Sequence, residues 1–396
     1  MIVRQSRTML CAIAFVATAS SAISASAQAT TAPEDVGPAL VTDQRISTLP
    51  VAERGAWTAY VRASRRLHDR DTASMNAELQ AVGRTLMGKA PYKAPDFQYF
   101  NRSDEWFSSD SIPLMAYAVL SFQTPSGGWS KRTDMTSPRT PGMSYYSETP
   151  DWHYIPTLDN GSTTGQLRFL ARVMTRNADP RFPAAYHRGI EYLLSAQQPN
   201  GCWPQSFPLE GGYHDAITFN DDATVLVLTT LDDVAAGRVA AATPSERERA
   251  ASSAHRGVQC LLETQVVVKG KRTVWGQQHD PISLEIVPAR KYELAGLAGR
   301  ESAAIMMYLM SLPAPDDHVI AAVDAAAQWF RAHAINGFRY ESYTLRAEPN
   351  GATIWPRLTE VSTDKPIFAN RDAIKLYDWN KLTDRRSGYG WFGTEP

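Results

Sequence analysis

Two acids and an amide lie directly ahead of an apolar stretch in the segment TFNDDATVLVL. They are Asn220, Asp221 and Asp222, and the Ala, Val and Leu residues that follow are typical of a buried helix. With Asn220 as N-cap and the two acids in the first turn, their oxygens would accept from free N–H groups and suit the helix dipole. The same oxygens could hold a cation, so the segment by itself leaves both roles open.

A second segment of this design occurs about 60 residues earlier, in IPTLDNGSTTGQLRFL. Asp159 and Asn160 precede a Gly-Ser-Thr-Thr turn, and an amphipathic helix follows. If both helices begin at the same end of a helical domain, Asp159, Asp221 and Asp222 converge. Ca²⁺ prefers about 6–8 oxygen ligands, whereas no His/Cys pair has transition-metal spacing. We therefore predict a calcium site formed by these three carboxylates.

Basic and aromatic residues gather in turns that contain Pro or Gly. Each arginine taken singly is most simply a solvated surface charge. Aromatic rings in loops can stack on sugars, however, and guanidinium groups bind carboxylates through paired hydrogen bonds. The combination favours a sugar polymer that carries carboxylates. The residues concerned are Trp129 and Lys131 in GGWSKR, Trp203 in GCWPQ, Arg290 and Tyr292 in VPARKYE, Arg357 in IWPRLTE and Arg371 in PIFANRDA.

A repeat organises the helices that must position these residues. Its three copies are YAVLSFQTPSGGWSKR, YLLSAQQPNGCWPQSF and CLLETQVVVKGKRTVWGQQ, each an apolar helical end, a Gln, a Gly-containing turn and a Trp. Between the copies, apolar residues recur at three- and four-residue intervals. Strand-like runs are few and short, with GFRYESYTL the clearest. This pattern predicts a mainly α fold, a ring of paired helices of α/α-toroid type. An irregular helical domain with accidental repeats is the alternative.

The N-terminus has the features of a secretory signal peptide. Arg4 and Arg7 are followed by a short apolar run and by Ala25-Ser26-Ala27, so we predict cleavage after Ala27 and a secreted or periplasmic protein. No segment is long enough to span a membrane. We interpret residues 28–95 as a leader and an N-terminal helical segment, and residues 96–396 as the main domain, which carries the acidic, basic and aromatic residues named above.

Charge and cysteine content narrow the possible partners. The 40 basic and 41 acidic residues become 38 and 41 after cleavage, a net charge of −3, which argues against nucleic acid as a bulk partner. Cys202 and Cys260 remain, and they could either pair or be two separate buried hydrophobic residues.

Seven stretches in the same order resemble the family 10 pectate lyases. They are GGWSK, TLDNGSTTGQLRFLARV, GIEYLLSAQQPNG-WPQ-FP, GGYHDAITFNDDATV, VPARKYELAGLAGRES, WPRLTEVSTDKPIFANRDAIKLYD and RRSGYGWFG. The resemblance covers about residues 104–393 and implies an α/α-toroid that cleaves polygalacturonate by β-elimination with calcium. Cys202 and Ala216 depart from the family pattern, where a glycine and a histidine are expected.

The resemblance also implies roles for individual residues. Asp159 would meet calcium and substrate at the cleavage site, with Asp221 and, beside it, Asp222 as further calcium ligands. Arg290 would be the Brønsted base, which requires a lowered pKa. We expect the positive charges of calcium and Lys291 to lower it. Lys131, Asn160, Arg357 and Arg371 would bind substrate carboxylates or hydroxyls.

The function predicted from sequence is therefore a pectate lyase that acts as a monomer on pectate. Two alternatives remain. One is an inverting glycoside hydrolase on a similar helical ring, which would use two carboxylates. The other is a non-catalytic protein that binds acidic polysaccharide.

Overall fold

The structure, a computed structural model, describes residues 39–148, 153, 155–384 and 389–394. The predicted signal peptide, residues 1–27, and the beginning of the predicted leader lie outside the described residues. Within the described part of the chain, no helix is long and apolar enough to cross a membrane.

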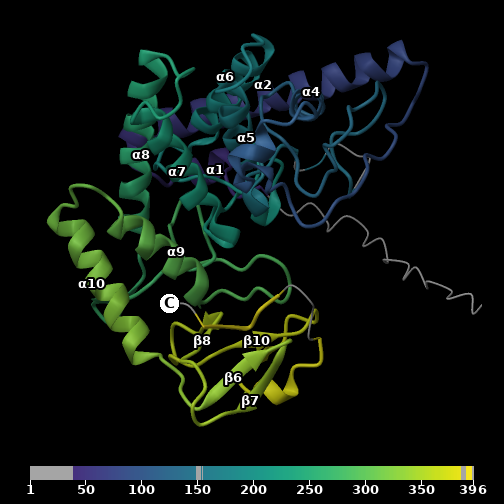
Figure 1. The fold of residues 1–396 in the computed structure, drawn as a ribbon. Helices are drawn as coiled ribbons and strands as arrows, with labels where there is room; N and C mark the ends of the chain where they lie inside the picture. The colour runs from purple at the N-terminus through teal and green to yellow at the C-terminus, as the bar shows by residue number, and fades with distance from the viewer. Residues whose placement is uncertain (1–38, 149–152, 154, 385–388, 395–396) are drawn as a thin grey trace, which may run out of the picture. The chain divides into compact units, whose positions relative to one another are not determined.

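Helices packed in sequential pairs form most of the regular structure (Figure 1). The pairs are α5 (Thr164–Met174) with α6 (Arg181–Ala196), α7 (Ala223–Ala235) with α8 (Pro244–Thr264), and α9 (Gly299–Met310) with α10 (Asp317–Ala332). Helices α5, α7 and α9 contact one another in order, as do α6, α8 and α10. The predicted class, a mainly α fold of α/α-toroid type with few short strands, is confirmed.

The remaining elements are mostly short. The other helices are α1 (Asp43–Ile46), α2 (Val51–Ala81), α3 (Asp104–Phe107), α4 (Ile112–Ser121) and the 3₁₀ turns η1 (Tyr99–Asn101), η2 (Asp159–Gly161), η3 (Gly212–Asp215), η4 (Asn220–Asp222) and η5 (Trp379–Lys381). The strands pair antiparallel in twos: β1 (Ile217–Thr218) with β4 (Gln278–His279), β2 (Val267–Val268) with β3 (Lys271–Arg272), β5 (Leu297–Ala298) with β9 (Leu358–Thr359), β6 (Phe338–Glu341) with β7 (Thr344–Ala347), β8 (Trp355–Pro356) with β12 (Phe392–Gly393), and β10 (Phe368–Ala369) with β11 (Lys375–Leu376).

A buried tryptophan anchors the turn of each repeat. The indole N–H groups of the three tryptophans donate to backbone carbonyls at the end of the preceding helix, over 2.6–2.9 Å. The donor and acceptor residues are Trp129 with Val119, Trp203 with Leu193, and Trp275 with Leu261. All three side chains are fully buried. The prediction that Trp129 and Trp203 stack on substrate is therefore wrong, because their ring faces are used by the core.

A glutamine in each repeat links the turn to the next outer helix. Each side-chain amide donates to one carbonyl of its own turn and one in the neighbouring helix, over 2.8–2.9 Å. The linked carbonyls are those of Gly127 and Ala185 for Gln123, Gly201 and Ser253 for Gln197, and Thr273 and Ala322 for Gln265. The Gln–Gly–Trp pattern is thus a device for joining helix pairs, and the repeats are not accidental.

Cys202 and Cys260 form a disulfide, with their Cα atoms 5.4 Å apart. The bond joins the second repeat turn to the outer helix α8. Of the two alternatives that the sequence left open, pairing is therefore the one that the structure contains.

The turns ahead of α5 and α7 share an unusual backbone. Asn160 in η2 and Asp221 in η4 have φ of 52° and 51°, a left-handed conformation that Asn and Asp tolerate better than most residues. Behind each turn, the Thr163 and Thr224 hydroxyls donate to the carbonyls of Thr157 and Thr218. The predicted N-cap role of Asn220 is wrong. Asp222 occupies the N-cap position of α7, and among the described residues it makes no capping side-chain bond.

The C-terminal part carries its own aromatic core beneath short strands. GFRYESYTL, the clearest strand-like run in the sequence, becomes the β6–β7 hairpin. Its Tyr340 packs with Phe368, Trp379, Trp391 and Phe392. Figure 1 shows these strands gathered in the green-to-yellow part of the chain. This core includes Tyr292 and Tyr389, and so it supports the segment that carries Arg290.

Candidate active site

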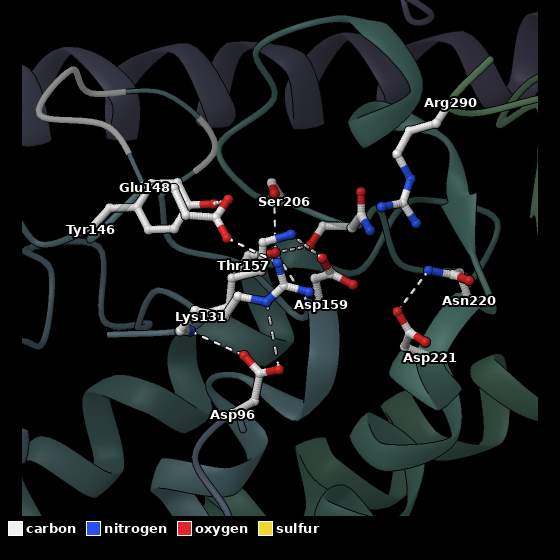
Figure 2. A network of polar contacts seen from close by, with 12 residues as sticks. Asp96, Lys131, Tyr146, Glu148, Thr157, Asp159, Ser206, Asn220, Asp221 and Arg290 are labelled. Carbon is white, nitrogen blue, oxygen red and sulfur yellow. Dashed lines mark hydrogen bonds and ion pairs between the residues drawn. The ribbon is translucent and has the colours of Figure 1, made fainter. Parts of the chain in front are cut away.

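Asp159 lies at the centre of a group of charged side chains that come from distant parts of the sequence. Figure 2 shows it between Lys131 and the Asn220–Asp221 pair, with the guanidinium of Arg290 directed toward them. Lys131 Nζ lies 2.5 Å from Asp159 Oδ2. Burial alone would raise the pKa of Asp159, but Lys131, and after it Arg290, lower it below its usual range. Asp159 is therefore held as a carboxylate.

Asp221 is the second carboxylate of the group and is orientated by Asn220. The Asn220 amide donates to Asp221 Oδ2 over 2.9 Å. Burial first, and then the nearby charge of Asp159, raise the pKa of Asp221 to about 6. Two carboxylates in one partly buried space repel each other, and a bound cation would relieve that repulsion.

A closed hydrogen-bond network keeps Asn220 in position. Arg357 and Gln277 each donate to both Asn220 Oδ1 and Glu301 Oε1, over 3.0–3.2 Å. Arg357 is buried, and its guanidinium lies 4.2 Å from the centre of the Tyr389 ring. These contacts make Arg357 a positioning residue for the Asn220–Asp221 turn. Its predicted contact with substrate remains a prediction.

Arg290 faces Asp159 from a loop and is bound to Glu293. Its Nη2 and Nε lie 2.6 and 2.8 Å from the two carboxylate oxygens, and Glu293 is fully buried. Burial lowers the pKa of Arg290, but the hydrogen bonds and charge of Glu293 raise it more, so the net shift is upward. The residues of the chain therefore raise the pKa of Arg290, and the prediction that they lower it is wrong. Lys291, expected to contribute to a lowering, is exposed.

The other predicted site residues lie in different surroundings. Tyr292 is buried beneath Arg290, 5.0 Å from ring centre to guanidinium carbon. Asn160 is half-buried in η2, next to Asp159. Arg371 is exposed and lies 3.7 Å from Asp384. No contact of the described residues joins Arg371 to the group around Asp159.

The donor set suits a hard cation, although it is not a ready-made cluster of three acids. Among the described residues, no three His, Cys, Asp or Glu side chains are grouped as metal ligands. The structure therefore shows no preformed group of these three acids, and the calcium site of Asp159, Asp221 and Asp222 remains a prediction. Arg300 lies 3.7 and 3.8 Å from Asp221 and Asp222. Yet Asp159 Oδ1 and Asp222 Oδ1 are buried and have no hydrogen-bond partner in the described part of the chain. Such orphaned carboxylate oxygens fit Ca²⁺.

Sequence reasoning missed the residues that orientate the charged groups: Gln277, Glu293, Arg300 and Glu301. Glu293 stands three residues after Arg290 in PARKYE, an opposite charge at short spacing that could have indicated the pair. Gln277 and Glu301 carry no such local signal, because their partners are distant in sequence.

A sequence model for the pectic acid lyase family matches residues 123–396. The chain belongs to the pectic acid lyase family. Among solved structures it is similar to a family 10 polysaccharide lyase from Cellvibrio cellulosa, with 30% identity and a TM-score of 0.65, covering 74% of this chain and 92% of that one. An Asp→Ala mutant of that lyase in complex with trigalacturonic acid gives 29% identity, the same TM-score and coverages of 73% and 92%. No curated protein sequence matches.

Family membership and these similar structures make the protein a polysaccharide lyase with pectate lyase-type function. The matched region includes Asp159, Asp221 and Arg290. It leaves residues 39–122, with the long helix α2, outside the family match.

Proposed function

We propose that this lyase cleaves polygalacturonate by calcium-assisted β-elimination and releases unsaturated oligogalacturonides. One observation carries the proposal: an ionised Asp159 and a second carboxylate, Asp221, share a partly buried space that Arg290 and Lys131 also face. The complex of the similar Cellvibrio enzyme with trigalacturonic acid supports an acidic sugar as substrate.

Elimination removes the proton on carbon 5 of a galacturonate residue, beside its carboxylate. The C5–H electrons form the C4=C5 double bond, the C4–O glycosidic bond breaks, and the leaving oxygen is protonated. Negative charge grows on the uronate carboxylate as the proton leaves, so the site must place positive charge there. When bound, Ca²⁺ supplies that charge.

The residues of the chain have separate parts in this scheme. Asp159 and Asp221 would hold the cation next to the uronate, and Lys131 would bind a substrate carboxylate when released from Asp159. Asn160 and Arg371 are further candidates for substrate contact, and Asp222 is a further candidate metal ligand. Such positioning can contribute several kcal/mol to lowering the barrier.

Arg290 is the proposed base, and its pairing with Glu293 shapes how it can act. A guanidinium whose pKa is raised is neutral only in a small fraction of molecules, but that fraction is a very strong base and grows with pH. We therefore expect turnover to rise with pH through the alkaline range.

The two alternatives are less consistent with the site. An inverting hydrolase needs one carboxylic acid that is protonated at working pH, whereas Lys131 keeps Asp159 ionised. A pure binding protein has no need for a guanidinium orientated by a buried carboxylate. Asp221 has a raised pKa, but at about 6 it leaves most of that side chain ionised at neutral and alkaline pH, where a general acid would have to be protonated.

The deciding experiment is incubation with polygalacturonate, with and without a calcium chelator, while ultraviolet absorbance is followed. We expect an absorbing unsaturated product that disappears with the chelator and returns when calcium is restored. New reducing ends without absorbance would indicate hydrolysis. Unchanged polymer would indicate a binding protein. We further propose that the protein is exported and acts as a monomer.

A further inference from the structure

The long helix α2 lies against the loops of the catalytic end, although it is outside the family match. Tyr60 donates to the Ala196 carbonyl, Ser64 accepts from the Leu209 N–H, and Arg70 donates to the Pro125 carbonyl. These partners lie in or next to the turns of the first and second repeats. Helix α2, purple in Figure 1, is therefore seated on the same loops that carry Lys131 and His214.

The second half of α2 also supports a segment beside the active site. Met75 packs against Tyr145, Tyr146 and Ile155. Glu78 accepts from Arg139 over 2.6 Å and from the Gly142 N–H over 2.5 Å. Tyr146 lies in the polar network of Figure 2. The helix is thus continuous with the wall of the site.

The outward face of α2 carries arginines with little compensation. Arg62, Arg65, Arg66 and Arg70, which we call the arginine stripe, are exposed and recur at helical spacing over about 12 Å. Arg62, Arg65 and Arg66 form no ion pair with any described residue. Between Arg62 and Arg70 the one exposed acid is Asp69, and Arg70 lies 3.7 Å from the buried Asp71, so the positive charge with least compensation is that of Arg62, Arg65 and Arg66.

A cavity separates Arg65 of the arginine stripe from a loop beside the active site. It has a volume of about 340 Å³ and lies between Arg65 and His68 of α2 and the loop from Leu209 to Asp215. Both acids of this loop have partners: Glu210 lies 3.0 Å from His153, and Asp215 accepts from the N–H groups of Glu210 and Gly211. The same loop contains His214, whose surroundings include Asp159 and Arg290.

We propose that the arginine stripe is an accessory track for the acidic polysaccharide, which binds uronate carboxylates of the polymer beyond the catalytic cleft. The inference rests on the proposed function for the identity of the polymer. Its physical basis is charge complementarity between a row of arginines and a chain with one carboxylate per sugar, on a helix adjoining the catalytic loops. Exposed pairs are individually weak, so the track should matter for long chains that engage several arginines together.

The test replaces Arg62, Arg65 and Arg66 together by Ala. Arg70 is kept because it bonds to the Pro125 carbonyl. A control variant with Arg331, Arg346 and Lys271 replaced by Ala removes the same charge from exposed positions elsewhere. Polymer affinity is measured with Arg290→Ala added to each protein, so that the polymer is not consumed. Turnover of trigalacturonate and polygalacturonate is measured without that addition.

We expect the stripe variant to bind polygalacturonate roughly 5- to 10-fold more weakly than the control variant. Its salt dependence should be shallower, and its turnover of trigalacturonate should be unchanged. Equal losses of turnover on trigalacturonate and polygalacturonate, or an unchanged affinity for the polymer, would overturn the proposal. A third outcome would also overturn it: wild type binds phosphatidylglycerol vesicles, and the stripe variant loses that binding but keeps its affinity for the polymer. If wild type forms no unsaturated product, the proposed function fails, and the polymer-binding comparison still decides the track.

Discussion

Arg290 Nη2 lies 2.6 Å from Glu293 Oε1, and Arg290 Nε lies 2.8 Å from Glu293 Oε2, so the proposed base is clamped by a buried carboxylate three residues away. The pair fixes the direction of the guanidinium and raises its pKa against the effect of burial. Glu293 therefore controls both the orientation and the basicity of Arg290, so substitutions in this pair test the proposed mechanism most directly.

Replacing Glu293 by Gln keeps the shape of the side chain and removes its charge. Because Glu293 raises the pKa of Arg290, its loss should lower that pKa and populate the neutral guanidine at lower pH. We expect the rise of kcat/KM with pH to move toward lower pH in the variant. A profile of unchanged position, with activity reduced equally at every pH, would show that Glu293 only orientates Arg290.

Replacing Arg290 by Ala should abolish elimination while the polymer still binds. Loss of a positioned base typically costs about 10²–10⁴-fold in rate. Arg290→Lys is the informative companion, because it keeps a positive charge but cannot form the same paired bonds to Glu293. Turnover by the Ala variant above a trace in the ultraviolet assay would contradict the base assignment. Full activity of the Lys variant would show that charge alone suffices.

Replacing Asp221 by Ala should weaken calcium binding without unfolding the protein. Its side chain bonds to Asn220, and the structure gives it no N-cap position. Calorimetric titration of the substrate-free protein should show an affinity at least about tenfold lower, which corresponds to ~1.4 kcal/mol. Asp222→Ala, measured alongside, separates the two neighbours. A large fall in melting temperature with normal calcium binding would mean that Asp221 is structural.

Replacing Trp203 by Phe tests whether this residue stabilises the core or contacts the substrate. The change removes the hydrogen bond to the Leu193 carbonyl and leaves a void in a fully buried position. We expect a loss of about 2 kcal/mol in unfolding free energy, with KM for polygalacturonate unchanged. Intact stability with a raised KM would restore the stacking role.

Replacing Asp71 by Asn should stabilise the protein at neutral pH. Asp71 lies in α2 with a fully buried side chain. Burial raises its pKa to about 6, and Ser126 and Arg70 offset only part of this. A raised carboxyl pKa means that wild type loses stability as pH rises from about 4 to about 6. The advantage of the Asp71→Asn variant over wild type in thermal unfolding should grow over that interval to about 2 kcal/mol. An advantage independent of pH would contradict the buried charge.

Local sequence was enough to establish the helical class and its repeat. Gln123, Gln197 and Gln265, each followed by a Gly-containing turn and a Trp, are local signals, because the glutamine and tryptophan bond to the helix ends and turns next to them in the chain. The acids Asp159 and Asp221 could be selected for the same reason, since each stands at a recognisable helix start.

The roles of those residues depend on contacts that exist only in the folded chain. The indoles of Trp129 and Trp203 face the core because Gly189 and Gly257 on the neighbouring outer helices leave room for them, with an added Cβ only 3.1 and 2.8 Å from the rings. The hydrogen-bond network of Asn220, Gln277, Glu301 and Arg357 joins residues up to 137 positions apart in the sequence. Lys131 and Asp159, which form an ion pair, are 28 positions apart. Composition and spacing cannot report such pairings, because they arise when helix pairs close on one another and bring distant turns to a common end.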